Sequence, residues 1–205
     1  NDSNHVLQDP SRVGYTFLGW TTSSIGTPTK DITISTGTFG NLTFTANWSA
    51  NKYNVTVLLN GGEASKTSYE VTYDSLYSIE EPTRVGYGFT GFVDTNNNTF
   101  ASSGIWKVDG DVTLTATWSA NTNTPYKVKH YLQNIAGTDY VLDDTETKYG
   151  TSDSMITVYS KNYTGFTPEV VSKETKLLPD GSLVVELYYT RNSYTLNFVT
   201  NGGSN

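Results

Sequence analysis

The sequence predicts a mainly β protein with little helix, built from small modules arranged in tandem. Apolar and polar residues alternate with period two over many short segments, which is the pattern of half-buried strands. Aromatic residues make up 13% of the chain, with 15 tyrosines, and such side chains suit the pleated surface of a sheet. Long motifs also recur at regular intervals, as expected of repeated structural units.

The strands are predicted from alternation alone. The clearest lies at 112–119, where apolar side chains fall on one face and Thr and Ser on the other. The segment 42–49 repeats this pattern. Shorter alternating segments at 69–73, 126–132 and 183–189 predict three further strands.

Turn-forming residues separate these strands. Asn60-Gly61 is expected to close a hairpin because both residues accept positive φ. Pro179-Asp180-Gly181 is expected to form a turn before the strand at 183–189. No window of a dozen residues keeps apolar positions at helical spacing with caps at its ends, so a short turn near Ser75–Glu80 is the one helical expectation.

Two motifs recur with nearly the same spacing. Pro-Ser-Arg-Val-Gly-Tyr-Thr-Phe-Leu-Gly-Trp at 10–20 reappears 72 positions later, at 82–92, as Pro-Thr-Arg-Val-Gly-Tyr-Gly-Phe-Thr-Gly-Phe. Leu-Thr-Phe-Thr-Ala-Asn-Trp-Ser-Ala-Asn at 42–51 reappears 70 positions later, at 112–121. The difference of two residues places a length change in the loop between the motifs.

These offsets divide the chain into four segments. Residues 1–50 correspond to the C-terminal part of one repeat, and residues 51–121 correspond to a complete repeat. Residues 122–191 match neither and form a module of a second type. Residues 192–205 correspond to the start of a further repeat, because their Tyr and Asn-Gly-Gly match the opening of the complete repeat 141 positions earlier.

Composition narrows the class of protein. The formal net charge is −7 with only 13 Lys and Arg, so no basic surface for nucleic acid or an anionic membrane is expected. No apolar run reaches the length needed to span a bilayer. The chain opens on a polar segment unlike a signal peptide, so we expect a piece of a longer protein. The absence of cysteine, with abundant Thr, Asn and Gly, is typical of bacterial surface modules.

The repeated motifs carry a resemblance to a known family. The complete repeat, with its Asn-Gly-Gly opening, its Gly-Tyr-x-Phe-x-Gly-Phe motif and its Leu-Thr-Ala-Thr-Trp strand, resembles a Listeria–Bacteroides repeat of the internalin B-repeat family. The family motif ends in Trp. Trp20 keeps that residue, whereas Phe92 replaces it conservatively.

The module of the second type resembles a mucin-binding-protein (MucBP-like) repeat. The similarity covers residues 126–191 and is carried by four short motifs: His130-Tyr131-Leu132-Gln133, Tyr163-Thr164-Gly165-Phe166, Asp180-Gly181-Ser182-Leu183-Val184 and Tyr188-Tyr189.

The two resemblances imply tandem small β-grasp (ubiquitin-like) modules in an elongated array. They also imply a non-catalytic segment of a bacterial surface or secreted protein, acting as a stalk or spacer and in adhesion. The alternative is an adhesin module that binds a mucin-type glycan or a host surface protein. Neighbouring repeats are the other expected partners. No catalytic residue, cofactor or metal ligand is implied.

Two acidic loops are candidates for calcium sites. Asp94-Thr95-Asn96-Asn97-Asn98 begins like an EF-hand loop, but Thr99 replaces the required glycine and Ile105 replaces the closing Glu. A surface hairpin is therefore expected. Asp109-Gly110-Asp111 is expected to form a turn before a strand.

Histidines and carboxylate pairs give no catalytic pattern. His5 and His130 lack metal-ligand spacing, and His130 is expected to be a packed or partly exposed structural residue. The adjacent carboxylates Glu80-Glu81 and Asp143-Asp144 are interpreted as solvated loop charge.

Tryptophan is the remaining candidate for ligand contact. Trp20, Trp48 and Trp118 lie in repeated motifs or alternating strands, which favours a place in the core. Trp48 and Trp118 are predicted to occupy equivalent buried positions. Trp106 follows Gly104 in a stretch that does not recur in the other copy, so it is the candidate for an exposed aromatic side chain that contacts a ligand.

The two ends of the chain are complementary when they are aligned with the complete repeat. Asp2-Ser3 aligns with Asp74-Ser75, so the first copy lacks the counterpart of residues 53–72, and 194–205 aligns with the missing first strand. A module without this strand exposes an unpaired edge. We expect that the tail either hangs disordered or fills the gap in a second molecule, head to tail.

Overall fold

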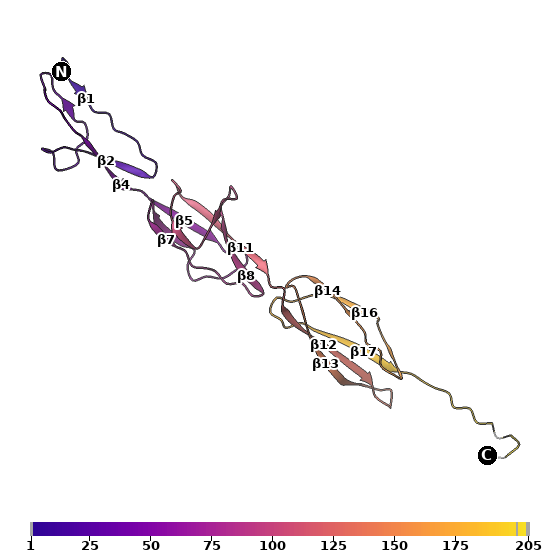
Figure 1. Cartoon of the computed structure of the whole chain (residues 1–205). Coiled ribbons are helices and arrows are strands. Elements are labelled where there is room, and N and C mark those ends of the chain that lie inside the picture. The colour runs from indigo at the N-terminus through magenta and orange to yellow at the C-terminus, as the bar shows by residue number, and fades with distance from the viewer. Residues whose placement is uncertain (1, 200, 204–205) are drawn as a thin grey trace. The chain divides into compact units, whose positions relative to one another are not determined.

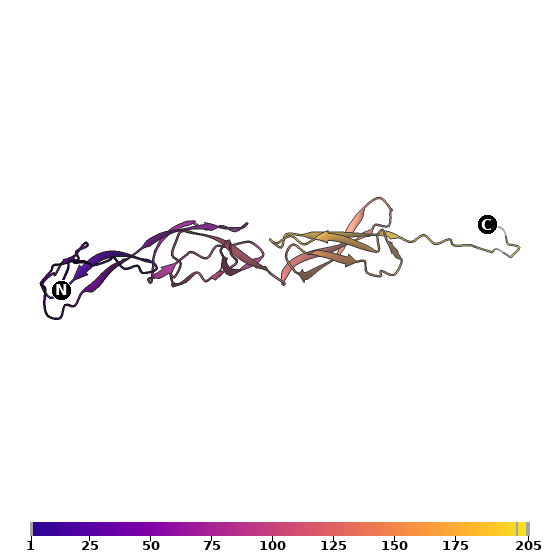
Figure 2. The same cartoon turned by 90° about the horizontal axis from the view of Figure 1, so that it is seen from above.

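The computed structural model describes residues 2–199 and 201–203, and these contain strands and loops but no helix (Figure 1). A second view shows the same all-strand composition (Figure 2). Within the described residues, no helix is long and apolar enough to cross a membrane. The chain forms two compact units, Asn1–Arg84 with Phe89–Trp118, and Val85–Gly88 with Ser119–Asn205.

The strands of the first unit follow in chain order. They are β1 His5–Val6, β2 Tyr15–Thr21, β3 Thr33–Ile34, β4 Thr45–Ala50, β5 Lys52–Leu58, β6 Ser68–Thr72, β7 Leu76–Ser78, β8 Tyr87–Val93, β9 Thr99–Phe100, β10 Ser103–Ile105 and β11 Val112–Ala120. The first two residues of β8 and the last two of β11 belong to the second unit. The second unit contains β12 Thr124–Gln133, β13 Tyr140–Gly150, β14 Met155–Tyr159, β15 Phe166–Pro168, β16 Ser172–Lys176 and β17 Val184–Arg191. The mainly β prediction is therefore confirmed.

The first repeat is held by two antiparallel pairs, β1 with β3 and β2 with β4. The β2–β4 pair has a bulge between Phe17 and Gly19, where the strand turns its side chains toward a small aromatic cluster. Phe17 is buried and meets Trp20 and Trp48 edge to face, with centroids 5.4 and 5.3 Å away. Aromatic contacts thus form the centre of this repeat.

The complete repeat is a five-stranded mixed sheet with the order β6-β5-β11-β8-β9. The central strands β5 and β11 run parallel, and β6 and β9 pair antiparallel at the edges. β7, which follows β6, and β10, which follows β9, form a separate antiparallel pair. Residues 76–78 are therefore a strand, so the helical turn expected near Ser75–Glu80 is wrong. β7 pairs with β10 over three residues, which outweighs any local helical preference.

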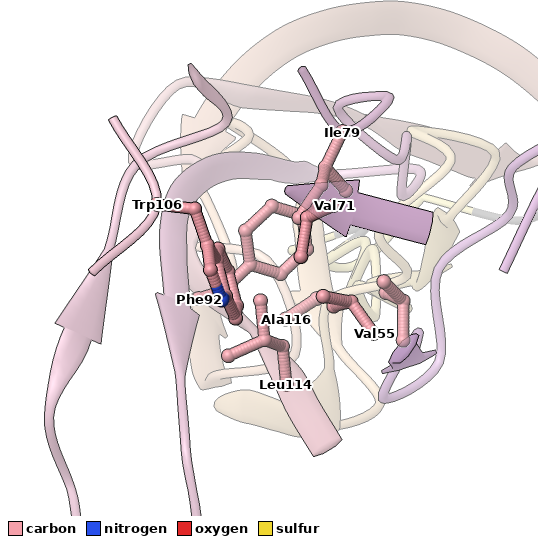
Figure 3. Packing of buried hydrophobic residues seen from close by; sticks show 8 residues of the cluster. Val55, Val71, Ile79, Phe92, Trp106, Leu114 and Ala116 are labelled. Carbon is pink, nitrogen blue, oxygen red and sulfur yellow. The ribbon is translucent and has the colours of Figure 1, made fainter. Parts of the chain in front are cut away.

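The core of the complete repeat comes from alternate residues of β5 and β11, from one residue each of β6 and β8, and from the segments just after β7 and β10. Its buried members are Val55, Val57, Val71, Ile79, Phe92, Trp106, Leu114 and Ala116 (Figure 3). Ubiquitin-like β-grasp stays a prediction, because no helix lies on this sheet in the part of the chain that the structure describes.

Trp48 and Trp118 occupy equivalent positions, as predicted. Trp48 packs edge to face on Phe17, and Trp118 packs in the same way on Phe89 at 5.8 Å and 68°. Both indoles are only partly buried, so the expectation of full burial is wrong.

The second unit contains a four-stranded sheet, β13-β12-β17-β15, and a separate pair, β14 with β16. β12 runs parallel to β17 and antiparallel to β13. The predicted strands at 126–132 and 183–189 are confirmed as these two central strands. Their inward residues form the core, together with residues of β14 and the loop after β16: Tyr126, Val128, Val158, Leu177, Val185, Leu187 and Tyr189.

The expected turn chemistry is also found. Asn60 and Gly61 have positive φ angles of 49° and 84°, which start the connection from β5 to antiparallel β6. At the other end, residues 192–199 form no strand, and Tyr194, Leu196 and Phe198 are 81%, 75% and 81% exposed. The predicted start of a further repeat also includes residues 200, 204 and 205, which lie outside the described residues.

Candidate functional sites

Trp106 lies in the core rather than on the surface. Its side chain is 1% exposed and its Nε1 donates a hydrogen bond to the Val108 carbonyl at 2.9 Å. Tyr77 meets the indole edge to face at 5.4 Å, and Phe100 stacks on it at 5.8 Å. The expectation that Trp106 is exposed is therefore wrong. The pairing of β10 with β7 carries the ring inward, and no local sequence signal reveals that pairing.

The Asp94–Asn98 loop is a closed hairpin turn between β8 and β9. Asp94 Oδ1 accepts the backbone N–H groups of Asn96 and Asn98, both at 2.8 Å, and Oδ2 accepts the Asn98 amide at 2.8 Å. These hydrogen bonds, that of the Asn98 side chain first, lower the pKa of Asp94. The loop therefore uses its carboxylate to hold its own backbone, as a surface hairpin requires.

The Asp109–Asp111 turn precedes β11 and holds the edge of β5. Asp109 accepts a short hydrogen bond from the Tyr53 hydroxyl. Asp111 Oδ1 accepts the backbone N–H of Asn54 at 2.7 Å. The two carboxylates thus bond to neighbouring residues of β5 and help to place this strand beside β11.

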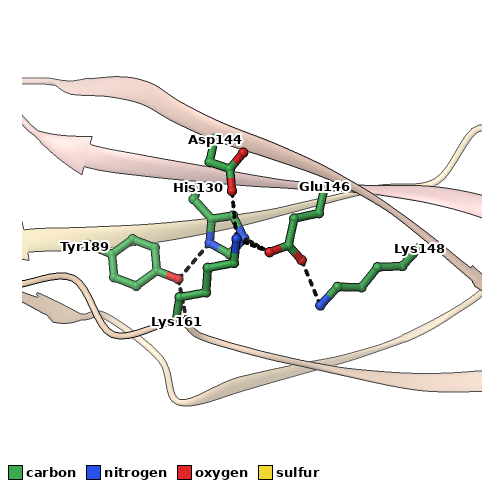
Figure 4. A network of polar contacts seen from close by, with 6 residues as sticks. All are labelled: His130, Asp144, Glu146, Lys148, Lys161 and Tyr189. Carbon is green, nitrogen blue, oxygen red and sulfur yellow. Dashed lines mark hydrogen bonds and ion pairs between the residues drawn. The ribbon is translucent and has the colours of Figure 1, made fainter.

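A polar network lies in the second unit around His130 of β12 (Figure 4). His130 is 1% exposed, and its Nδ1 lies 2.8 Å from the Tyr189 hydroxyl of β17. The same hydroxyl accepts the backbone N–H of Lys161 at 2.9 Å. His130 Nε2 faces Glu146 Oε1 at 3.8 Å and has no hydrogen-bond partner among the described residues.

Lys161 supplies the positive charge of this network. Its Nζ lies 2.7 Å from Asp144 Oδ2 and makes a short ion pair with Glu146 (Figure 4). Lys148 Nζ lies 2.9 Å from the other Glu146 oxygen. Asp143 and Asp144 both lie in β13, and Asp144 has an ion-pair partner, so the interpretation of this pair as loop charge is wrong.

The charges of this network shift several pKa values. Hydrogen bonds from Lys161 lower the pKa of Asp144 and of Glu146, and those two carboxylates raise the pKa of Lys161. Burial, followed by the nearby Lys161 charge, lowers the pKa of His130. His130, Asp144 and Glu146 place metal-ligand atoms within 4.8 Å of one another, and the Lys161 ammonium bonds both carboxylates of that set.

A junction between repeats is visible inside the first unit at Asn51. β4 ends at Ala50 and β5 begins at Lys52, so this one residue separates the first repeat from the second. Its N–H donates to the Gly14 carbonyl at 2.9 Å, and its carbonyl accepts the Tyr73 N–H at 2.9 Å. Asn51 is thus held from both sides. Asn51 aligns with Asn121 in the repeated motif, but no sequence pattern indicates a role for either residue.

The second unit contains the same backbone arrangement at Asn121. Its N–H donates to the Gly86 carbonyl at 2.9 Å, and its carbonyl accepts the Ser152 N–H at 2.9 Å. A residue of the same type, 70 positions further on, therefore makes the same pair of hydrogen bonds.

The first repeat carries an open hollow of about 580 Å³. One wall is formed by Leu42–Thr45, the counterpart of residues 112–115 of β11. In the complete repeat those residues pair parallel with β5, and β11 begins at Val112, whereas β4 begins only at Thr45. The hollow thus lies along the part of the strand whose counterpart is paired in the complete repeat.

Known relatives match part of the chain. Internalin H of Listeria monocytogenes is 33% identical over 135 residues, which cover 59% of this chain and 23% of that protein. A protein of Evansella cellulosilytica described as a Gly-rich membrane protein is 33% identical over 123 residues, which cover 56% of this chain and 13% of that protein. The match thus spans about a quarter or less of each relative.

One solved structure, titled "Crystal structure of Mub-RV", matches 69% of this chain and 99% of its own chain, at 12% identity and a TM-score of 0.18.

The family model described as the Listeria-Bacteroides repeat domain matches residues 1–47 and 53–117. These two matches flank Asn51 and end before Trp118. Because they cover more than half of the chain, this chain belongs to the Listeria-Bacteroides repeat domain family.

Proposed function

We propose that this chain is a non-catalytic repeat segment of a bacterial cell-surface or secreted protein, in which it acts as a stalk or spacer. The observation that carries this proposal is the Asn51 junction, where one residue links two repeats and both of its backbone groups are hydrogen-bonded. A short linker with both backbone groups bonded restricts the orientation of one module relative to the next, and a spacer needs this restriction.

The proposed organisation is that of the four segments defined by the sequence repeats. Residues 1–50 and 51–121 are Listeria–Bacteroides-type repeats, 122–191 is a MucBP-like repeat, and 192–205 begins a further repeat. Neighbouring repeats are the partners in this proposal. The net charge of −7 argues against nucleic acid or an anionic membrane as a partner of this segment.

The chemistry of the polar network supports a structural role. The carboxylates around Lys161 raise the pKa of its amine, so it stays protonated and is no nucleophile at neutral pH. His130 is 1% exposed, so a substrate in solvent cannot reach its ring. These groups stabilise the sheet rather than provide an acid and a base.

Exchange of the segment in its parent surface protein tests the spacer role. Replacement by an unrelated rigid segment of equal length is expected to preserve the activity of the domains beyond it, and deletion is expected to reduce it. If the equal-length replacement abolishes activity, the segment itself contributes binding. The alternative adhesin function, with a mucin-type glycan or a receptor as ligand, then gains support from binding above background on a glycan array.

A further inference from the structure

The Gly-Tyr pair at the start of the repeated aromatic motif has a role that its own module does not explain. Phe17 and Trp20 of the motif pack inside the first repeat. Tyr15 instead points to the second repeat, where its hydroxyl donates a 2.7 Å hydrogen bond to Asp74 Oδ2. Its ring also meets the Tyr73 ring edge to face, with centroids 5.6 Å apart and planes at 74°.

Gly14 is needed at this contact for two reasons. Its φ of +77° lies in the left-handed region, which favours glycine. In addition, a Cβ at this position would overlap the ring of Tyr73. The second reason is imposed by the following repeat rather than by the turn in which Gly14 lies.

The receiving turn is built to accept the hydroxyl. Asp74 has a φ of 60°, and its N–H donates to the Trp106 carbonyl at 2.9 Å, which fixes the turn on the core of the second repeat. Lys107 makes a short ion pair with the Asp74 carboxylate and lowers its pKa, with the Tyr15 hydrogen bond as the second cause. The hydrogen bond to Asp74 raises the pKa of Tyr15. Donor and acceptor therefore keep these roles at neutral pH.

The second unit repeats this arrangement with a turn of different sequence. Tyr87 donates a short hydrogen bond to Asp153, whose φ is 62° and whose other oxygen lies 2.7 Å from Lys176 Nζ. A Cβ at Gly86 would come within 2.7 Å of the Ser152 hydroxyl oxygen. Only the central Asp and the Ser after it are shared by the two receiving turns, Tyr73-Asp74-Ser75 and Ser152-Asp153-Ser154.

The backbone of the two turns agrees as well. Asp153 N–H donates to the Leu177 carbonyl at 3.0 Å, which corresponds to the bond from Asp74 to Trp106. Ser75 donates to Thr72, and Ser154 donates to Thr151, both at 3.1 Å. The same geometry is thus produced by modules with different sequences.

We propose that Gly-Tyr is a docking element for the following module. The Asp of that module's Xaa-Asp-Ser turn accepts the Tyr hydroxyl, and the Xaa side chain lies against the Gly, where a Cβ would not fit. The partner surface is therefore any next module that presents this turn, whether it is of the Listeria–Bacteroides type or of the second type. This inference rests on the proposed spacer function and names the side chains that orient consecutive modules.

The third copy of the element differs in an informative way. Asn192 N–H donates to the Gly165 carbonyl at 2.9 Å, as Asn51 does to Gly14. The residue after Gly165 is Phe166, which has no hydroxyl. This copy keeps the backbone contact and lacks the donor, so it would hold a following module less tightly.

Pulsed electron paramagnetic resonance on the full chain tests the proposal. The chain has no cysteine, so Phe39→Cys and Thr95→Cys place two spin labels on exposed positions of the first and second repeats. The Tyr15→Phe variant is expected to broaden the distribution of label-to-label distances. The Tyr77→Phe variant is the matched control, because its hydroxyl donates to the Ala101 carbonyl within one repeat, and it is expected to leave the width unchanged.

A second pair of variants tests the glycine. Gly14→Ala is expected to shift or broaden the distribution, whereas Gly37→Ala is not, because Gly37 has a similar φ of +84° but no neighbour within 4 Å of an added Cβ. Circular dichroism checks that each variant is folded. Distributions of equal width for the unmodified chain and Tyr15→Phe would overturn the proposal. The segment-exchange experiment tests the spacer function, and the label-to-label distances test the Gly-Tyr contact. Either experiment can fail while the other succeeds, so the two failures can be told apart.

Discussion

The Tyr189 hydroxyl lies 2.8 Å from Nδ1 of His130, between two side chains that are 0% and 1% exposed. The same oxygen accepts the backbone N–H of Lys161 at 2.9 Å. One hydroxyl therefore satisfies two groups that burial would otherwise leave unpaired. On the far side of the imidazole, the charges of Lys161 and Glu146 set the electrostatic environment.

Acidification is expected to destabilise the second unit through His130. Burial and the Lys161 charge lower the pKa of this histidine in the folded state, against opposing effects of Glu146 and Asp144. Below about pH 6.5 the unfolded chain binds a proton that the folded chain does not, so stability falls as pH falls, by at most about 1.4 kcal/mol per pH unit. Urea unfolding between pH 7 and pH 5, followed by the NMR signal of Val128, measures this slope.

Two variants isolate this effect. His130→Gln is expected to remove the slope, whatever its effect on stability at pH 7. His5→Gln is the control, because His5 is exposed in the first repeat, and it is expected to keep the slope. An unchanged slope in His130→Gln would show that another group binds the proton. The carboxylates Asp144 and Glu146 have lowered pKa values and act below this pH range.

Removal of the Tyr189 hydroxyl is expected to cost more than one hydrogen bond of average strength. In Tyr189→Phe the ring can stay in place, but the Lys161 N–H and His130 Nδ1 both lose their partner. A loss of about 1–3 kcal/mol in the free energy of unfolding follows, because buried polar groups are left unpaired. Tyr194→Phe is the control, with its side chain 81% exposed. Equal stability of the two variants in urea unfolding would contradict the role given to the hydroxyl.

Trp106 is expected to be the most costly tryptophan to remove. Its indole is 1% exposed and packs between Tyr77 and Phe100, so Trp106→Ala should cost about 3–5 kcal/mol. Trp118→Ala should cost less, because this side chain is only partly buried. Urea unfolding by circular dichroism gives both values. A loss under 1 kcal/mol for Trp106 would contradict its place in the core of the complete repeat.

Calcium is expected to leave the melting temperature of the chain unchanged. In the loop between β8 and β9, three donors already bond the Asp94 carboxylate. A ligand that binds the folded state raises the melting temperature by mass action, so calorimetry with and without millimolar Ca²⁺ detects a site. A rise that disappears in Asp94→Ala would place a calcium site in this loop.

The 205-residue chain is expected to associate through its tail. Tyr194, Leu196 and Phe198 are exposed, whereas the aligned residues of the complete repeat lie on β5 beside β11. In this prediction the tail of a second molecule binds along residues 42–45, which line the hollow of the first repeat. Light scattering over a range of concentrations should show a rising mass for the intact chain and a constant mass after deletion of 193–205. A monomeric intact chain at high concentration would show that the tail does not exchange between molecules.

The sequence by itself determined the repeated motifs and the inward faces of its clearly alternating strands. Alternation is a local property, so Leu114 and Ala116 of β11, and Val185 and Leu187 of β17, could be assigned to the core from their neighbours alone. The repeat offsets likewise placed Trp48 and Trp118 in equivalent positions without any knowledge of their contacts.

Only the tertiary structure decided the contacts between residues far apart in the chain. Trp106 is buried because β7 and β10 pair, although its own segment has no strand pattern that would place it inside. Tyr15 meets Asp74 and His130 meets Tyr189, each across 59 positions, and neither pair has a periodic signal. The physical reason is that hydrogen bonds and ion pairs depend on the register and packing of several strands together, whereas the alternation that predicts a strand depends on that strand alone.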